Sequence, residues 1–244
     1  MTDPLFRFTV PRLPHGIAMT AKEIENFFLQ EIRDTDGKSK NALWQLAVLY
    51  SETDRQEEAF EYVSKLAALA EASDERASCY LAMGQLYEQV EDFAGAARYY
   101  RAGLAEEAED SPAWYWIHNN LGYCLNQLGQ FGEAATYLRA AIAIASDRPN
   151  AFKNLALALQ GEKKYQEAAD LFVLATQVNA TDARSLKHLE ELVTAHPEVL
   201  LGAPDLANKL QACREAVAHA RAQQPDFDAH LKALREQQKN QKPS

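Results

Sequence analysis

The chain is poor in the residues that mark several common classes of protein. Its 244 residues include only three cysteines, which are too few for a disulfide framework and favour a reducing compartment. Ten glycines and nine prolines are fewer than a loop-rich β-sandwich or a disordered chain would contain. No apolar run approaches the roughly 18–20 residues of a membrane helix, and residues 1–10 lack the pattern of a secretory signal. We therefore expect a cytoplasmic, soluble and mostly helical protein.

Basic residues are also scarce. The chain has 25 basic and 35 acidic residues, for a net charge of −10. Residues 40–110 hold 15 of the acidic and 6 of the basic residues, so this block alone carries a net charge of −9. Binding to nucleic acid requires a basic footprint, which is missing here. We expect protein or peptide partners, no nucleic acid and no membrane insertion.

Sequence motifs of catalysis and metal binding are missing as well. The chain contains no Cys-x-x-Cys, phosphate-binding loop, Gly-x-Ser-x-Gly or His-Glu-x-x-His. Its six histidines do not place two ligands on one face of a helix. We expect no enzymatic activity, no metal site and no cofactor.

What the chain does contain is a repeat. A small residue preceded by Leu or Met recurs at intervals of 37, 38 and 34 residues, at Ala47, Gly84, Gly122 and Ala156. Alanine follows each small residue after 12 positions, and a large apolar residue comes four positions later. The pattern predicts two antiparallel helices per unit, with small residues where the helices approach closely. Each hairpin has an apolar face that it cannot bury alone, so the units must stack into an all-α solenoid.

The third unit carries a family resemblance. Leu121 and Gly122, followed by Ala134, Leu138 and Ala141 and closed by Pro149, resemble the tetratricopeptide repeat (TPR). The resemblance covers about residues 40–182 and implies a right-handed α-solenoid, the TPR superhelix, of four units: 40–76, 77–114, 115–148 and 149–182. The tryptophan of the family pattern, four positions before the small residue, is replaced in all four units, by Leu43, Tyr80, His118 and Phe152.

Both ends extend beyond the repeats. Residues 1–39 predict an extended N-terminal arm and a helix that begins at Thr20, with Ile24, Phe27, Phe28 and Ile32 on its inner face. Residues 183–244 predict a capping helix over 183–196, two further helices over 205–224 and 226–238, and a polar tail.

The resemblance implies that the first helix of each unit faces a concave groove. Amide side chains at these positions could pair with both the N–H and the C=O groups of an extended peptide, and aromatic ones could anchor it. The predicted peptide-binding residues are Trp44, Gln45, Gln85, Trp116, Asn119, Asn120, Tyr123, Lys153, Asn154, Arg184, Lys187 and His188. Two alternatives stay open: the asparagines are ordinary surface residues, and Trp44 and Trp116 pack within their units.

Some TPR domains bind the acidic C-terminal tails of heat-shock chaperones through a two-carboxylate clamp. At the clamp positions Asn154 matches, Arg184 is a conservative change and His188 a partial one, whereas Asn119 and Tyr123 do not match. The cationic residues of this region, Lys153, Arg184 and Lys187, could still receive a carboxylate.

Two functions follow from this pattern. The first is a non-enzymatic scaffold that binds an extended peptide or a partner terminus in the TPR groove. The alternative is a structural subunit that self-associates into a homo-oligomer, or docks in a larger complex, through its terminal helices.

Overall fold

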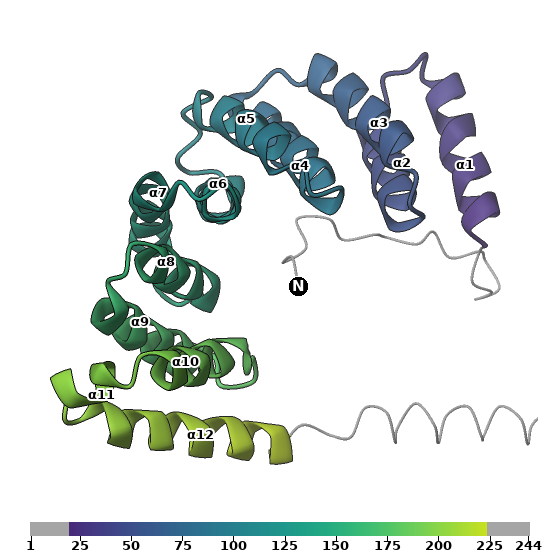
Figure 1. Cartoon of the computed structure of the whole chain (residues 1–244). Helices are drawn as coiled ribbons and strands as arrows, with labels where there is room; N and C mark the ends of the chain where they lie inside the picture. Colours follow the sequence, from purple (N-terminus) through teal and green to yellow (C-terminus); the bar gives the residue numbers. More distant parts are fainter. Residues whose placement is uncertain (1–19, 224–244) are drawn as a thin grey trace, which may run out of the picture. The chain divides into compact units, whose positions relative to one another are not determined.

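The computed structural model describes residues 20–223, and the chain over this range forms twelve α-helices and no β-strand (Figure 1). The fold is an all-α solenoid of helix hairpins, as the repeat predicts. The chain divides into two compact units, residues 1–145 and 146–244. The first holds α1–α7 and the second α8–α12, and each unit is described by itself.

The first unit contains three hairpins preceded by a single helix. Its helices are α1 (Ala21–Asp34), α2 (Lys40–Glu52), α3 (Gln56–Leu69), α4 (Ser73–Gln89), α5 (Phe93–Leu104), α6 (Ala113–Gln127) and α7 (Phe131–Ile144). The hairpin pairs are α2 with α3, α4 with α5 and α6 with α7. Neighbouring hairpins are joined by contacts of α3 with α4 and of α5 with α6 (Figure 1).

The second unit contains one hairpin covered by three helices. Its helices are α8 (Pro149–Gly161), α9 (Tyr165–Val178), α10 (Arg184–Ala195), α11 (Glu198–Gly202) and α12 (Leu206–Gln223). Besides pairing with α8, helix α9 contacts α10, α11 and α12. The helices predicted over 183–196 and 205–224 are therefore α10 and α12, whereas the five-residue α11 was not predicted. The predicted N-terminal arm and the helix over 226–238 lie outside the described residues.

The small repeat residues sit where the two helices of a hairpin touch. A Cβ atom at Gly84 would lie 2.3 Å from the Tyr100 ring on α5. At Gly122 it would lie 2.4 Å from Leu138 Cγ on α7. Tyr100 and Leu138 are fully buried, so neither can move aside without disturbing the core. The predicted role of the small residues in close helix approach is confirmed at these two positions.

The turn inside each hairpin has the same backbone geometry. The residue seven positions after the small residue has a positive φ, and the next N–H bonds to the carbonyl oxygen five residues earlier, which is the Schellman closure of a helix. The positive-φ residues are Asp54 (57°), Glu91 (58°), Gly129 (73°) and Lys163 (63°). The bonds run from Arg55 to Tyr50 (2.8 Å), Asp92 to Tyr87 (3.0 Å), Gln130 to Leu125 (2.8 Å) and Lys164 to Leu159 (2.8 Å). Glycine marks only one of these four turns, so glycine alone would not locate them.

Helix α1 begins where the sequence predicts. The Thr20 hydroxyl accepts from the Glu23 amide at 3.3 Å, and the Glu23 carboxylate accepts from the Thr20 amide at 2.7 Å, which forms a capping box. Ile24 and Phe28 are buried as expected, but Phe27 is 48% exposed and its predicted place on the inner face is wrong. Among the helices described, α1 packs chiefly on α2. Its buried stripe is therefore too narrow to cover both phenylalanines.

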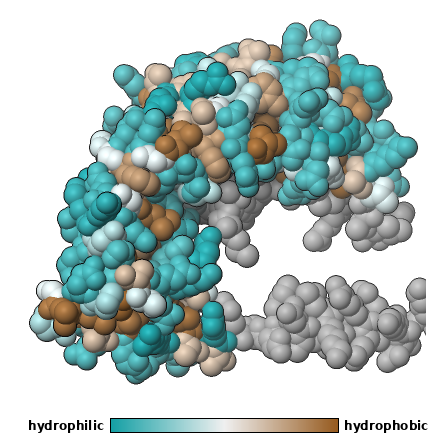
Figure 2. Space-filling view, in the orientation of Figure 1, coloured by the Kyte–Doolittle hydropathy of each residue, from teal (hydrophilic) through white to brown (hydrophobic). Residues whose placement is uncertain are grey.

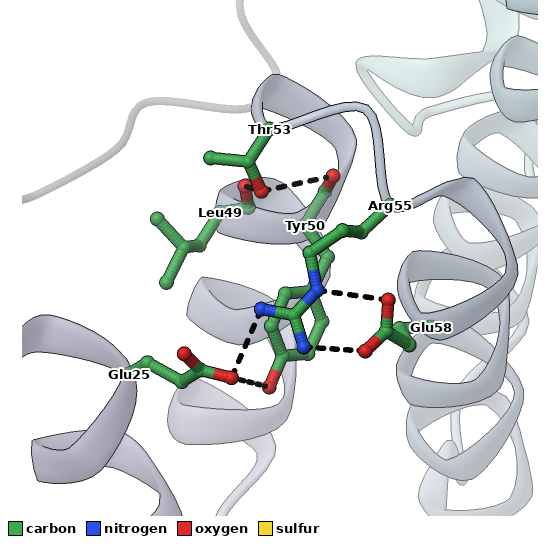
Figure 3. Close-up of polar contacts among 6 residues, drawn as sticks. All are labelled: Glu25, Leu49, Tyr50, Thr53, Arg55 and Glu58. Carbon is green, nitrogen blue, oxygen red and sulfur yellow. Dashed lines mark hydrogen bonds and ion pairs between the residues drawn. The ribbon is translucent and has the colours of Figure 1, made fainter. Parts of the chain in front are cut away.

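A cluster of polar contacts holds α1 against the first hairpin (Figure 3). Arg55, in the turn before α3, donates from Nη1 to Glu25 of α1 at 3.0 Å and pairs with Glu58 of α3. Its guanidinium lies 4.0 Å from the centre of the Tyr50 ring, and the Tyr50 hydroxyl donates to Glu25 at 2.8 Å. Arg55 thus links three helices by charge-assisted hydrogen bonds and a cation–π contact.

Candidate functional site

The predicted amides lie on the first helices of the hairpins, and the structure buries most of them. Gln45 is 5% exposed on α2, Asn119 and Asn120 are 5% and 7% exposed on α6, and Asn154 is 5% exposed on α8. Gln85 on α4 is half-buried. The four buried amides stand out because only seven polar side chains are buried in the described part of the chain. Two of the other three, His118 and Thr176, bond to carbonyl oxygens of their own helix.

In the first unit, buried hydrogen bonds connect α6 with α4 and α5. Asn119 Nδ2 donates to Asn120 Oδ1 at 2.9 Å, and Asn120 Nδ2 donates to the Tyr100 hydroxyl at 3.5 Å. The Tyr100 hydroxyl in turn donates to the Glu88 carboxylate of α4. The Cys124 thiol of α6 bonds to the same carboxylate. The two predicted asparagines are thus brought together with a tyrosine and a glutamate that the sequence analysis did not include in the site.

Glu88 provides the only carboxyl group among the side chains that these hydrogen bonds connect. Burial raises the pKa of its carboxyl from 4.5 to about 7, and the bonds from Tyr100 and Cys124 offset only part of that rise. Burial and the nearby Glu88 carboxylate raise the pKa of the Tyr100 and Cys124 side chains well above their ordinary values, so both remain neutral donors. The signal available in the sequence was the position of Glu88, four residues after the small residue Gly84 and facing the groove side of α4.

The two predicted tryptophans have different surroundings. Trp44 on α2 is half-buried and lines a pocket of about 350 Å³, together with Leu66, Ala70 and Cys79. An ion pair between Lys40 and Glu75 (2.7 Å) also lines this pocket. Trp116 on α6 is 7% exposed and meets the Tyr115 ring edge to face, with 4.9 Å between centroids. Tyr123, also on α6, is half-buried and lies against Phe93 of α5 at 5.9 Å.

In the second unit, the predicted cationic residues gather around Lys153 of α8. Burial lowers the Lys153 pKa, and the Arg184 guanidinium lowers it further. Arg184 is already paired, since its Nε lies 2.8 Å from Asp182 Oδ1 and its Nη2 2.5 Å from Oδ2. That pair lowers the Asp182 pKa to about 2. Arg184 therefore pairs with a carboxylate of its own chain, whereas the sequence predicted a cation available to a partner's carboxylate.

The remaining two predicted residues lie further along α10. His188 stacks on Phe172 of α9 with 5.6 Å between ring centres, and burial lowers the pKa of its imidazole. Lys187 is exposed and lies 3.7 Å from Glu191. Of the predicted cationic residues, Lys187 thus extends furthest into solvent.

Within residues 20–223 no group of three or more His, Cys, Asp or Glu side chains could hold a metal ion. The three cysteines are buried and form no disulfide, and burial raises the pKa of Cys79 to about 11, which favours its neutral thiol. None of the helices over this range is long and apolar enough to cross a membrane.

Comparisons with known proteins agree with the repeat seen in the helices. Residues 78–112 and 117–148 each match a family model described as tetratricopeptide repeat. No curated protein matches the chain.

Several solved structures are similar in fold. YrrB, described as a TPR protein with an unusual peptide-binding site, is 21% identical and has a TM-score of 0.58 over 80% of this chain and 97% of its own. MamA from Desulfovibrio magneticus RS-1 is 18% identical, with a TM-score of 0.56 over 84% of this chain and 97% of its own. BtubC (BKLC) from P. vanneervenii is 17% identical, with a TM-score of 0.63 over 83% of this chain and 88% of its own.

At these identities the solved structures support the fold alone. The family comes from the chain itself, because two matched repeats coincide with hairpins whose small residues, turns and buried alanines recur at one spacing. The chain therefore contains tetratricopeptide repeats.

Proposed function

We propose that this protein is a non-enzymatic scaffold that binds an extended segment of another protein along the first helices of its repeats. The observation that carries the proposal is the concentration of buried amides on those helices, at Gln45, Asn119, Asn120 and Asn154. A buried amide lowers stability unless it is hydrogen-bonded. A side-chain amide has both donors and acceptors, the two kinds of group that an extended peptide backbone pairs with, and the amides recur on first helices of both compact units.

The neighbouring side chains fit the same role. Gln85 and Tyr123 are half-buried in the first unit, so part of each remains accessible to a partner. Trp44 lines a pocket large enough for an apolar side chain. Aromatic residues with a polar surround are typical anchors of peptide binding. YrrB, which is similar in fold, is described as having a peptide-binding site, and we infer a peptide-binding function for this chain as well.

The proposal can be tested by screening the full chain against a displayed library of random peptides and measuring the Kd of a selected peptide. We expect Tyr123→Ala to weaken binding about tenfold or more, because an aromatic anchor is lost. The matched control is Arg139→Ala, an exposed position on the second helix α7, which should leave the Kd unchanged. Failure to select any peptide, or equal Kd values for Tyr123→Ala and the control, would contradict the proposal.

The alternative function, self-assembly, has one observation in its favour. Leu201 on α11 is 85% exposed, the largest value among the exposed large apolar side chains of the described residues. Figure 2 shows hydrophobic residues at the surface around this helix. Light scattering across a concentration series would test this function. A mass that grows with concentration and returns to that of the monomer in Leu201→Glu would support assembly through α11, and a constant monomer mass would contradict it.

A further inference from the structure

Glu88 differs from the carboxylates of the first unit that form ion pairs. Glu25 and Glu58 pair with Arg55, Glu75 pairs with Lys40, and Glu106 pairs with Arg76. The Glu88 carboxylate is held instead by two neutral donors, the Tyr100 hydroxyl and the Cys124 thiol. No cationic side chain of the described residues forms an ion pair with it. A partly buried carboxylate without a cation loses hydration and gains no charge pairing in return.

The position of Glu88 connects it to the proposed binding surface. It lies one helical turn after Gln85, on the same side of α4. On α6, which contacts α4, burial and the nearby Glu88 charge raise the pKa of the Tyr123 phenol. Part of the Glu88 side chain remains accessible, and the hydrogen bonds through Tyr100 and Asn120 fix the place of its carboxyl.

The charge of the surroundings attracts cations. The acidic block from residue 40 to residue 110 includes Glu88 and carries a net charge of −9. Such a surface raises the local concentration of basic segments. The titratable groups that face Glu88 are Tyr100 from α5 and Tyr123 and Cys124 from α6, and none of them carries a positive charge.

We propose that the Glu88 carboxylate receives a lysine or arginine side chain of the extended segment that this protein binds. The inference rests on the proposed scaffold function and adds the chemistry of the partner at one point of the surface. An arriving ammonium or guanidinium supplies the charge that the Tyr100 and Cys124 donors cannot supply. When the cation binds, the carboxyl gives up its proton to the solvent, so binding is linked to proton release near neutral pH.

The experiment starts from one basic peptide selected by the full chain from a random displayed library. Each Lys or Arg of that peptide is replaced in turn by norleucine, and every Kd is measured with the wild type, Glu88→Gln and the control Glu57→Gln, an exposed position on α3. We expect one replacement to weaken binding to the wild type and to Glu57→Gln about 10–100-fold, the range for a hydrogen-bonded charge, and to have little effect in Glu88→Gln. Binding to the wild type should also strengthen up to about tenfold between about pH 6 and pH 8, and this change should vanish in Glu88→Gln.

A second measurement covers the case in which Glu88→Gln does not fold. Calorimetry of the wild type in buffers of different ionisation enthalpy should detect proton release on binding the basic peptide, and none with the norleucine peptide. If a peptide binds but no basic residue matters, or if the norleucine effect persists in Glu88→Gln, the inference is wrong while the scaffold function stands. If no peptide binds, both the scaffold function and the inference are wrong.

Discussion

At the residue scale, Glu88 shows how burial changes the stability of a protein with pH. Its pKa in the folded protein is about 7, above the ordinary 4.5, so between these values the folded state binds more protons than the unfolded state. The free energy of unfolding therefore falls as the pH rises through this window. We expect the wild type to lose up to about 3 kcal/mol between about pH 5 and pH 8 relative to Glu88→Gln. Urea denaturation at the two pH values measures this difference, and parallel profiles would contradict it.

Gly122 shows how one missing side chain sets the distance between two helices. In Gly122→Ala the new Cβ would meet Leu138 Cγ at 2.4 Å, so we expect a loss of about 1–3 kcal/mol of stability from overpacking. The clash is specific to one partner. Trimming that partner in Gly122→Ala/Leu138→Ala should therefore cost less than the sum of the single changes. A strictly additive double mutant in thermal or urea unfolding would mean that the glycine acts in another way.

At the element scale, the repeated turns place either glycine or a residue with a Cβ atom at the same positive-φ position, so the cost of that conformation can be compared. Lys163 has φ 63°, a conformation that costs a residue with a Cβ about 1–2 kcal/mol and costs glycine little. We expect Lys163→Gly to stabilise the protein by about 0.5–1 kcal/mol, after the entropy of the added glycine is subtracted. Gly129→Ala, at the equivalent position with φ 73°, should destabilise it. Melting temperatures that shift in the same direction in both variants would contradict the assignment of these turns.

Arg55 shows how an edge helix is held at its place. Its guanidinium reaches Glu25 of α1 and Glu58 of α3 while stacking on Tyr50 of α2, which requires a planar group with several donors (Figure 3). Arg55→Lys keeps the charge but cannot make all these contacts. We expect faster amide hydrogen exchange in α1 and unchanged exchange in α4 and α5. If amides of α1 exchange at the same rate in Arg55→Lys as in the wild type, α1 is held by its apolar contacts alone.

At the scale of the whole molecule, the division into two compact units predicts how the chain can be cut. The first unit has its own buried core, which includes Leu46, Val63 and Met83. Repeat arrays are stabilised by nearest-neighbour contacts, so a fragment that keeps complete hairpins should fold. We expect residues 1–145 to give a helical circular dichroism spectrum and a cooperative thermal transition. A fragment of residues 1–104 lacks α6 and should melt at a lower temperature, and an unfolded 1–145 fragment would contradict independent stability of this unit.

Some residues of the candidate site could be predicted from the sequence and others could not. Asn119 and Asn120 were found because their positions relative to Gly122 follow the repeat, and the structure places them in one network. Glu88 and Tyr100 were not included in the predicted site because their positions in the repeat do not show that folding brings the carboxylate and the hydroxyl together. Arg184 was counted as an open cation because the sequence does not show that its guanidinium folds back onto Asp182.

The sequence by itself determined that the chain forms helix hairpins and the spacing at which they recur. That information is local, since small residues and apolar residues recur within a unit of 34 to 38 residues. Only the tertiary structure decided which polar side chains are buried and what they bond to. The Glu88 carboxyl owes its chemistry to a hydroxyl 12 residues away and a thiol 36 residues away, and only the packing of α4, α5 and α6 removes the water between them.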